Sequence, residues 1–234
     1  MHRTSTSESL LGRLGSQPAA LWFSLALVSA GFWISGLPGN DVLTVAYSFP
    51  DGGGRCSLQD SGVSETIEHK GSVILPASAG GTYCCGFTFQ VAMRVARLRG
   101  LLDDKSVEDV RRFQKIWYGA LPGSEIRQCA MAVEELGVGY SVDLEDARPG
   151  DFMQLWCVGR GAGHSVIFLD WLRDREGRVV GVRFRSSGGR GVGDGTAFFA
   201  DAWPTVSSIE RGSVVVARLH RSWWSRLVYP FFWG

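Results

Sequence analysis

The sequence lacks an excess of charge of either sign. Its 24 lysines and arginines and 23 aspartates and glutamates leave a net charge of +1 over 234 residues, so no overall field favours a nucleic acid as partner. A Cys-x-x-Cys pair is also missing, which argues against zinc-ribbon and thioredoxin patterns. No internal repeat of about 20–50 residues is present, so neither a solenoid nor a propeller is expected. Nothing in the sequence implies a metal or an organic cofactor.

Glycine, by contrast, is abundant. It occupies 31 of the 234 positions, or about 13%, against an average usage of about 7%. The glycines follow no three-residue period, which excludes collagen. The apolar fraction of 45% and the charged fraction of 20% exclude a disordered chain. The length fits one domain with an additional segment.

The N-terminal part contains an uncharged apolar segment, residues 19–37. It approaches the ~20 residues with which a helix spans a bilayer. Two interpretations stay open. The segment is either a signal peptide cleaved after residues 28–30, or a transmembrane anchor with Arg3 and Arg13 on the cytoplasmic side of the membrane. A buried core helix is less favoured because the segment has almost no polar stripe. We expect an exported or membrane-anchored protein with an extracytoplasmic domain.

Three parts follow from this pattern: a leader or anchor region at 1–40, a globular domain at 41–220 and an aromatic, cationic tail at 221–234. The tail fits either a membrane interface or a cover over the domain core.

The pattern inside the globular domain predicts an α+β fold, because helices come first and an antiparallel meander of strands follows. Apolar spacing predicts a helix at 84–102. Ser106 is the expected N-cap of a second helix, and a third opens at Ser124, buries Ile126 and ends at Gly137. Residues 188–195 are expected to form a flexible loop beside a cleft. The predicted strands are 42–47, 72–75, 152–158, 164–171, 179–185 and 213–219.

Five cysteines do not form a clear disulfide framework. An odd number in an exported protein leaves at least one thiol unpaired within the chain. We expect Cys129 and Cys157 to be small core residues, and Cys56, in a glycine-rich loop, has no assigned role.

Two features carry candidate chemistry. Cys84 and Cys85 stand where a glycine-rich loop becomes a helix. The helix dipole and free N–H groups there favour a thiolate and can hold an oxyanion. His164 begins an apolar strand, and it can act as base and acid if that strand packs beside the helix start. The other histidines lie before the apolar segment or in less ordered contexts: His2, His69 and His220.

These residues resemble a known family. Residues 84–87 (Cys-Cys-Gly-Phe) look like the catalytic helix start of NlpC/P60 cysteine peptidases. Residues 148–156 are similar to that family's Pro-Gly-Asp strand, and residues 163–169 to its Gly-His strand. CHAP amidases share the layout. The resemblance covers roughly residues 80–190 and implies a papain-like fold, with a helical half packed on an antiparallel sheet. It also implies cleavage of amide bonds in peptide or peptidoglycan substrates.

The resemblance implies a role for each matching residue. Cys84 aligns with the nucleophile, Cys85 is the alternative, and His164 is the base. The family's third polar residue falls on Ser187 or Ser186, either of which is expected to orient the imidazole more weakly than a carboxylate. The remaining two candidates, assigned to substrate binding, are Tyr83, where the family usually has Asp, and Gln154, which is also an oxyanion donor candidate.

Three alternatives to a hydrolase remain at this point. The departures at the third residue and before the nucleophile favour an inactive binding module on the same fold. Adjacent thiols can also form a strained disulfide, which makes a redox switch a further hypothesis. Finally, both cysteines can be buried small residues without chemistry.

Overall fold

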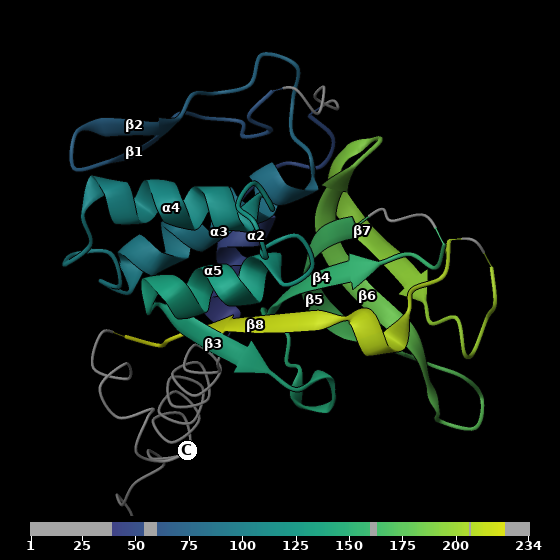
Figure 1. Ribbon diagram of the computed structural model, residues 1–234. Helices are drawn as coiled ribbons and strands as arrows, with labels where there is room; N and C mark the ends of the chain where they lie inside the picture. Colours follow the sequence, from purple (N-terminus) through teal and green to yellow (C-terminus); the bar gives the residue numbers. More distant parts are fainter. Residues whose placement is uncertain (1–38, 54–59, 160–162, 206, 223–234) are drawn as a thin grey trace, which may run out of the picture. The chain divides into compact units, whose positions relative to one another are not determined.

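A computed structural model describes residues 39–53, 60–159, 163–205 and 207–222, which belong to one unit, Pro38–Gly234. The apolar segment 19–37, most of the aromatic tail, His2 and Cys56 lie outside the described residues. Within the described part, no helix has both the length and the apolar character needed to cross a membrane. The described chain is a mixed α+β structure with antiparallel sheets (Figure 1).

The main sheet has six strands in the order β3-β8-β4-β5-β6-β7, and every neighbouring pair is antiparallel. Strands β4, β5 and β6 are the first three strands of the predicted meander, β7 continues it at residues that were not predicted to form a strand, and β8 returns between β3 and β4. The strands are β3 Gly139–Val142, β4 Phe152–Trp156, β5 Gly163–Arg173, β6 Val179–Gly188, β7 Gly191–Phe198 and β8 Val215–Leu219. A separate hairpin pairs β1 (Ile67–His69) with β2 (Ser72–Leu75).

Four α-helices are described: α2 Asn40–Tyr47, α3 Cys84–Leu98, α4 Val107–Trp117 and α5 Gln128–Leu136. Short 3₁₀ helices follow at Leu144–Asp146 and Arg211–Ser213. In Figure 1, α3, α4 and α5 gather on one side of the view and strands β5 to β7 on the other.

Both faces of the main sheet are covered by apolar clusters, so successive side chains of a strand enter different parts of the core. Phe152 of β4 lies in the cluster shared with the helices, and the next residue, Met153, lies in a second cluster on the opposite face. Successive strand residues point to opposite faces, so one strand supplies both clusters. Trp117 of α4 meets Phe152 edge-on at 5.2 Å between ring centroids. This contact joins α4 to the first residue of β4, which pairs with Ile167 in the middle of β5.

Several helix predictions are confirmed. Ser106 caps α4 through a reciprocal bond with Asp109, and Gly137 ends α5 with φ of 68°, which favours glycine. However, α5 begins at Gln128 and not at Ser124, because the Ser124 hydroxyl closes a turn by donating to the Leu121 carbonyl at 2.6 Å. Ile126, predicted to be buried, is 61% exposed, since it precedes the helix.

Two predictions were wrong. Residues 42–47 form a helix, not a strand, because the buried residues Val42 and Ala46 lie four apart on one helical face, and tertiary packing overrides the strand preference of β-branched residues. Residues 188–195 are not a loop throughout: Gly191 opens strand β7, and Gly193 pairs with Ser186 of β6. Pairing with β6 supplies hydrogen-bond partners for the backbone N–H and C=O groups, so the strand forms even where its residues are glycines.

Candidate active site

The first turn of α3 carries the two adjacent cysteines. Tyr83 precedes it in an extended conformation and makes no side-chain cap, and the Phe87 N–H donates to the Tyr83 carbonyl at 2.9 Å. The first N–H groups of a helix have no partner inside the helix, so they are suited to an oxyanion. Gly86 is required here, because a Cβ would come 2.0 Å from the Gly62 carbonyl oxygen of a crossing loop.

Strand β5 brings His164 to this helix start. His164 pairs with Leu155 of β4, and its imidazole lies near enough to Cys84 to lower the pKa of that thiol. The backbone N–H of Ser165 lowers the pKa of the same thiol. The structure therefore brings together the sulfur at the start of α3 and the imidazole at the start of β5.

A buried hydroxyl pair locks α3 on β5 one turn after Cys84. The Thr88 hydroxyl donates to the Cys84 carbonyl at 2.9 Å and lies 2.7 Å from the Ser165 hydroxyl. The indole N–H of Trp117 donates to the same Thr88 oxygen at 3.1 Å. Because Thr88 and Ser165 are at most 1% exposed, losing either partner leaves a buried polar group unsatisfied.

The environment of Cys84 lowers its thiol pKa to about 4. The hydrogen bond with Cys85 is the largest cause, and burial opposes it. The hydrogen bond and charge of His164 and the N–H of Ser165 also lower the pKa. The same contact, together with burial, raises the pKa of Cys85 well above its usual range. These opposite pKa shifts favour Cys84 as the thiolate and Cys85 as the thiol, and the thiolate is the nucleophilic form.

The two serines predicted to orient His164 make other bonds. The Ser186 hydroxyl donates to the Ser165 carbonyl at 2.6 Å. The Ser187 hydroxyl donates to the Thr82 carbonyl at 3.0 Å and lies 2.7 Å from the Thr82 hydroxyl. These bonds hold β6 to β5 and to the loop before Cys84. The His164 ring instead meets the edge of the Phe184 ring, with 5.4 Å between centroids.

The two residues predicted to bind substrate are largely enclosed by protein. Gly62 lies against the face of the Tyr83 ring, because a Cβ on this glycine would come within 2.2 Å of that ring. Gln154 is 1% exposed, and its Oε1 has no hydrogen-bond partner. Gln154 pairs with Ser165, the residue that follows His164, and Tyr83 directly precedes Cys84. Both residues therefore lie beside the site, where they pack against other parts of the protein.

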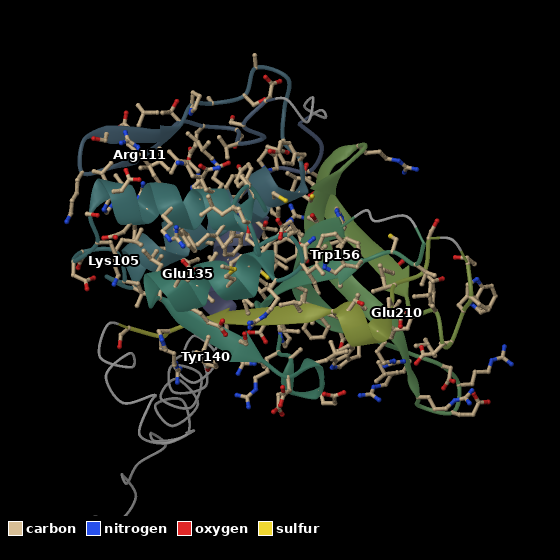
Figure 2. The ribbon with its side chains drawn as sticks, in the orientation of Figure 1. Lys105, Arg111, Glu135, Tyr140, Trp156 and Glu210 are labelled. Carbon is tan, nitrogen blue, oxygen red and sulfur yellow. The ribbon has the colours of Figure 1, made fainter. Side chains whose placement is uncertain are left out.

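Trp156, labelled in Figure 2, is the last residue of β4 and pairs with Gly163, the first residue of β5. Its indole N–H donates to the Ile126 carbonyl at 3.1 Å. A Cβ on Gly163 would come 2.7 Å from the Trp156 ring, so glycine is needed directly before His164.

The sequence analysis did not identify five residues that support the pair, four of them polar and one aromatic. Thr88 lies four residues after Cys84, one helical turn away, and Ser165 follows His164 directly, so both spacings were available as signals. Gln128 and Phe184 come from other elements and have no local signal. The missed set is Thr82, Thr88, Gln128, Ser165 and Phe184.

A cleft of about 680 Å³ adjoins His164. Its wall is held by Arg185, which is 2% exposed and binds Asp51 at 2.7 Å and Asp194 at 3.0 Å. This guanidinium also donates to the Ala46 and Phe49 carbonyls, so it ties the end of α2 to β6 and β7.

Three of the glycines that line the cleft are required neither by their backbone conformation nor by close packing. Gly188, Gly189 and Gly193 have no positive φ, and a Cβ at any of them would meet nothing within 4 Å. Neither backbone conformation nor packing therefore excludes side chains there. Their absence keeps the cleft open beside His164, in a volume typical of small-molecule sites, about 300–1,000 Å³.

Comparison of the chain with protein-family models, with curated proteins and with solved structures gave no match. Among the residues that the structure describes, no group of three or more His, Cys, Asp or Glu is arranged to hold a metal ion.

Proposed function

We propose that this protein is a thiol hydrolase that cleaves amide bonds, with Cys84 as nucleophile and His164 as base and acid. The observation that carries the proposal is the placement of His164 beside Cys84 at a helix start without a side-chain cap, where the imidazole helps to lower the pKa of Cys84 to about 4. Such a pair supplies a preformed nucleophile and a proton carrier in one place.

The residues can perform both halves of the reaction. The Cys84 thiolate attacks the amide carbon, and the resulting oxyanion is held by N–H groups of the first turn of α3. As the carbon–nitrogen bond breaks, the His164 imidazolium gives its proton to the leaving amine. Neutral His164 then takes a proton from the water that attacks the thioester. The tetrahedral intermediate collapses, the carbon–sulfur bond breaks and the carboxylic acid leaves, so Cys84 is again a thiolate beside the His164 imidazolium.

The arrangement also supports a papain-like architecture as part of the proposal. The helix with the nucleophile packs on an antiparallel sheet, and the histidine begins a central strand of that sheet. This agrees with the resemblance to NlpC/P60 peptidases. Peptidoglycan peptides as substrates, and export or anchoring through residues 19–37, belong to the same proposal.

The test uses the full chain and peptidoglycan fragments, with release of free amino groups as the measurement. Cys84→Ala should reduce turnover at least about a thousandfold, as loss of a covalent nucleophile does. Cys129→Ala is the matched control, because it removes a helix-start thiol that lies in the core, and it should keep turnover. Equal turnover in wild type and Cys84→Ala contradicts the proposal.

One observation favours a second candidate, a non-catalytic module that binds the same peptides. Both serines at the position of the third catalytic residue donate their hydroxyl protons to backbone carbonyls, of Ser165 and Thr82, so these protons are not given to an imidazole. Binding of peptidoglycan fragments without amine release, and equally by wild type and Cys84→Ala, is the result expected of such a module.

A further inference from the structure

The thiol of Cys85 lies between two acceptors. Its sulfur is 3.9 Å from the Cys84 sulfur and 3.9 Å from Oε1 of Gln128. Both distances are within reach of a sulfur hydrogen bond. The Cys85 side chain also packs against the core cluster of the helices, whereas Cys84 is not among the residues of that cluster. Cys85 is therefore held on the inner side of the nucleophile.

Gln128 is oriented so that its oxygen faces Cys85. Its amide nitrogen donates to the Glu125 carbonyl at 3.3 Å, which identifies the other terminal atom as the oxygen. Gly119 lies against the amide group, because a Cβ there would come 2.6 Å from Nε2. The acceptor is thus fixed in place before any reaction begins.

A thiol has one proton to donate, so Cys85 bonds one acceptor at a time. We propose that Cys85 is a positioning residue, which donates its S–H to the Cys84 thiolate in the resting site and to Gln128 when Cys84 is acylated. The inference rests on the proposed function and adds a role that the adjacent thiol plays within it.

The physical reason is selective stabilisation of one state of Cys84. A thiolate is a charged acceptor, and hydrogen bonds to charged groups are stronger than those between neutral groups. A thioester sulfur carries no charge, so the S–H then bonds the amide oxygen of Gln128. Cys85 is never left as a buried donor without a partner in either state, which avoids the cost of an unsatisfied group.

The test is the rate at which iodoacetamide alkylates Cys84, followed by peptide mass across a range from about pH 3 to about pH 9. In Cys85→Ala, the midpoint of the rate profile should rise by at least about one pH unit, a tenfold change in the thiol–thiolate equilibrium. Cys85→Ser is nearly the same size as alanine but restores a donor, so it should return the midpoint towards the wild-type value.

Gln128→Ala is a second variant, which does not alter either cysteine. It removes the competing acceptor, so alkylation of Cys84 at low pH should be at least as fast as in the wild type. Slower alkylation in this variant overturns the inference, even where Cys85→Ala fails to fold.

Two outcomes separate this inference from the proposed function. An unchanged low midpoint in Cys85→Ala, or an equal rise in Cys85→Ala and Cys85→Ser, assigns Cys85 only a packing role and leaves the hydrolase intact. A midpoint that responds to Cys85 as expected, together with no amine release from any peptide, supports the inference and contradicts hydrolysis.

Discussion

The first turns of α3 and α5 place cysteines in the same local position but give them opposite chemistry. Cys84 is the first residue of α3, and Cys129 is the second residue of α5. The pKa of Cys84 is lowered to about 4, whereas burial raises the pKa of Cys129 to about 12. A helix N-terminus is common to both, so it cannot by itself account for the thiolate.

The magnitudes explain the difference. A helix terminus contributes about 0.3–1 kcal/mol to a nearby charge, while full burial can shift a pKa by about 3–5 units. Cys129 is 1% exposed in the core, and burial raises its pKa by more than the backbone N–H groups of Ala130 and Cys129 and the charge of Arg127 lower it. Cys84 has a thiol donor, an imidazole and a backbone N–H. Partners decide the chemistry, and the dipole assists.

The largest expected effect is the difference in alkylation between the two helix starts. At about pH 6, Cys84 is almost wholly thiolate and Cys129 almost wholly thiol. The greater intrinsic reactivity of a high-pKa thiolate offsets part of this, so we expect at least about a hundredfold faster alkylation of Cys84 by iodoacetamide. Peptide mass spectrometry measures the two rates in one sample.

The control is the same reaction in denaturant, where the two cysteines should react at similar rates. Similar rates in the folded protein contradict the contrast between the two helix starts.

Removing the imidazole should make the start of α3 more like that of α5. In His164→Ala, the pKa of Cys84 rises because a hydrogen bond and a nearby positive charge are lost. A raised pKa means that the thiolate appears only at higher pH, so alkylation at about pH 6 should fall by about tenfold or more. His69→Ala is the control, since His69 bonds the Lys105 carbonyl, and it should leave the profile unchanged. Equal profiles in both variants remove His164 from the site.

Access also distinguishes the two helix starts, and the effect should be several-fold. Gly193→Leu places a side chain in the cleft beside His164, so a peptidyl chloromethyl ketone should react with Cys84 more slowly, while iodoacetamide reacts as before. Gly212→Leu is the matched control, because Gly212 also has no positive φ and nothing within 4 Å of a Cβ. If the large reagent reacts equally with both variants, the substrate does not use this cleft.

The sequence predicted the two halves of the site because each half has a local signal. The loop-to-helix transition places Cys84 at a helix start, and the apolar run after His164 predicts a strand. Residues 42–47 were assigned wrongly for a related reason: β-branched residues favour strands locally, and only the packing of Val42 and Ala46 selects a helix. Local preference is a weak guide where tertiary burial decides.

The supporting residues could not be predicted, because their partners are distant in the chain. Gln128 reaches Cys85 across 43 positions, and Ser187 reaches Thr82 across 105. The alignment of Ser186 and Ser187 with a catalytic position identified their strand, but it could not indicate where each hydroxyl points. Donor directions depend on the assembled sheet and loop, and single-sequence patterns carry no such information.

The smallest expected effect concerns the stability of the α5 start. Cys129→Ala removes a buried sulfur and leaves a space about the size of a methyl group, which should cost about 1 kcal/mol at neutral pH. The loss of stability caused by this substitution should be smaller at alkaline pH. The folded protein holds the proton of Cys129, because the pKa is raised to about 12, whereas the unfolded chain releases it from about pH 8.5. Wild-type stability from this thiol is therefore complete below about pH 8.5 and declines as pH rises towards about 12. Chemical unfolding of wild type and Cys129→Ala at neutral and alkaline pH measures the packing cost and its dependence on pH. If the difference in unfolding free energy between the two proteins stays constant with pH, the raised pKa at this second helix start is contradicted.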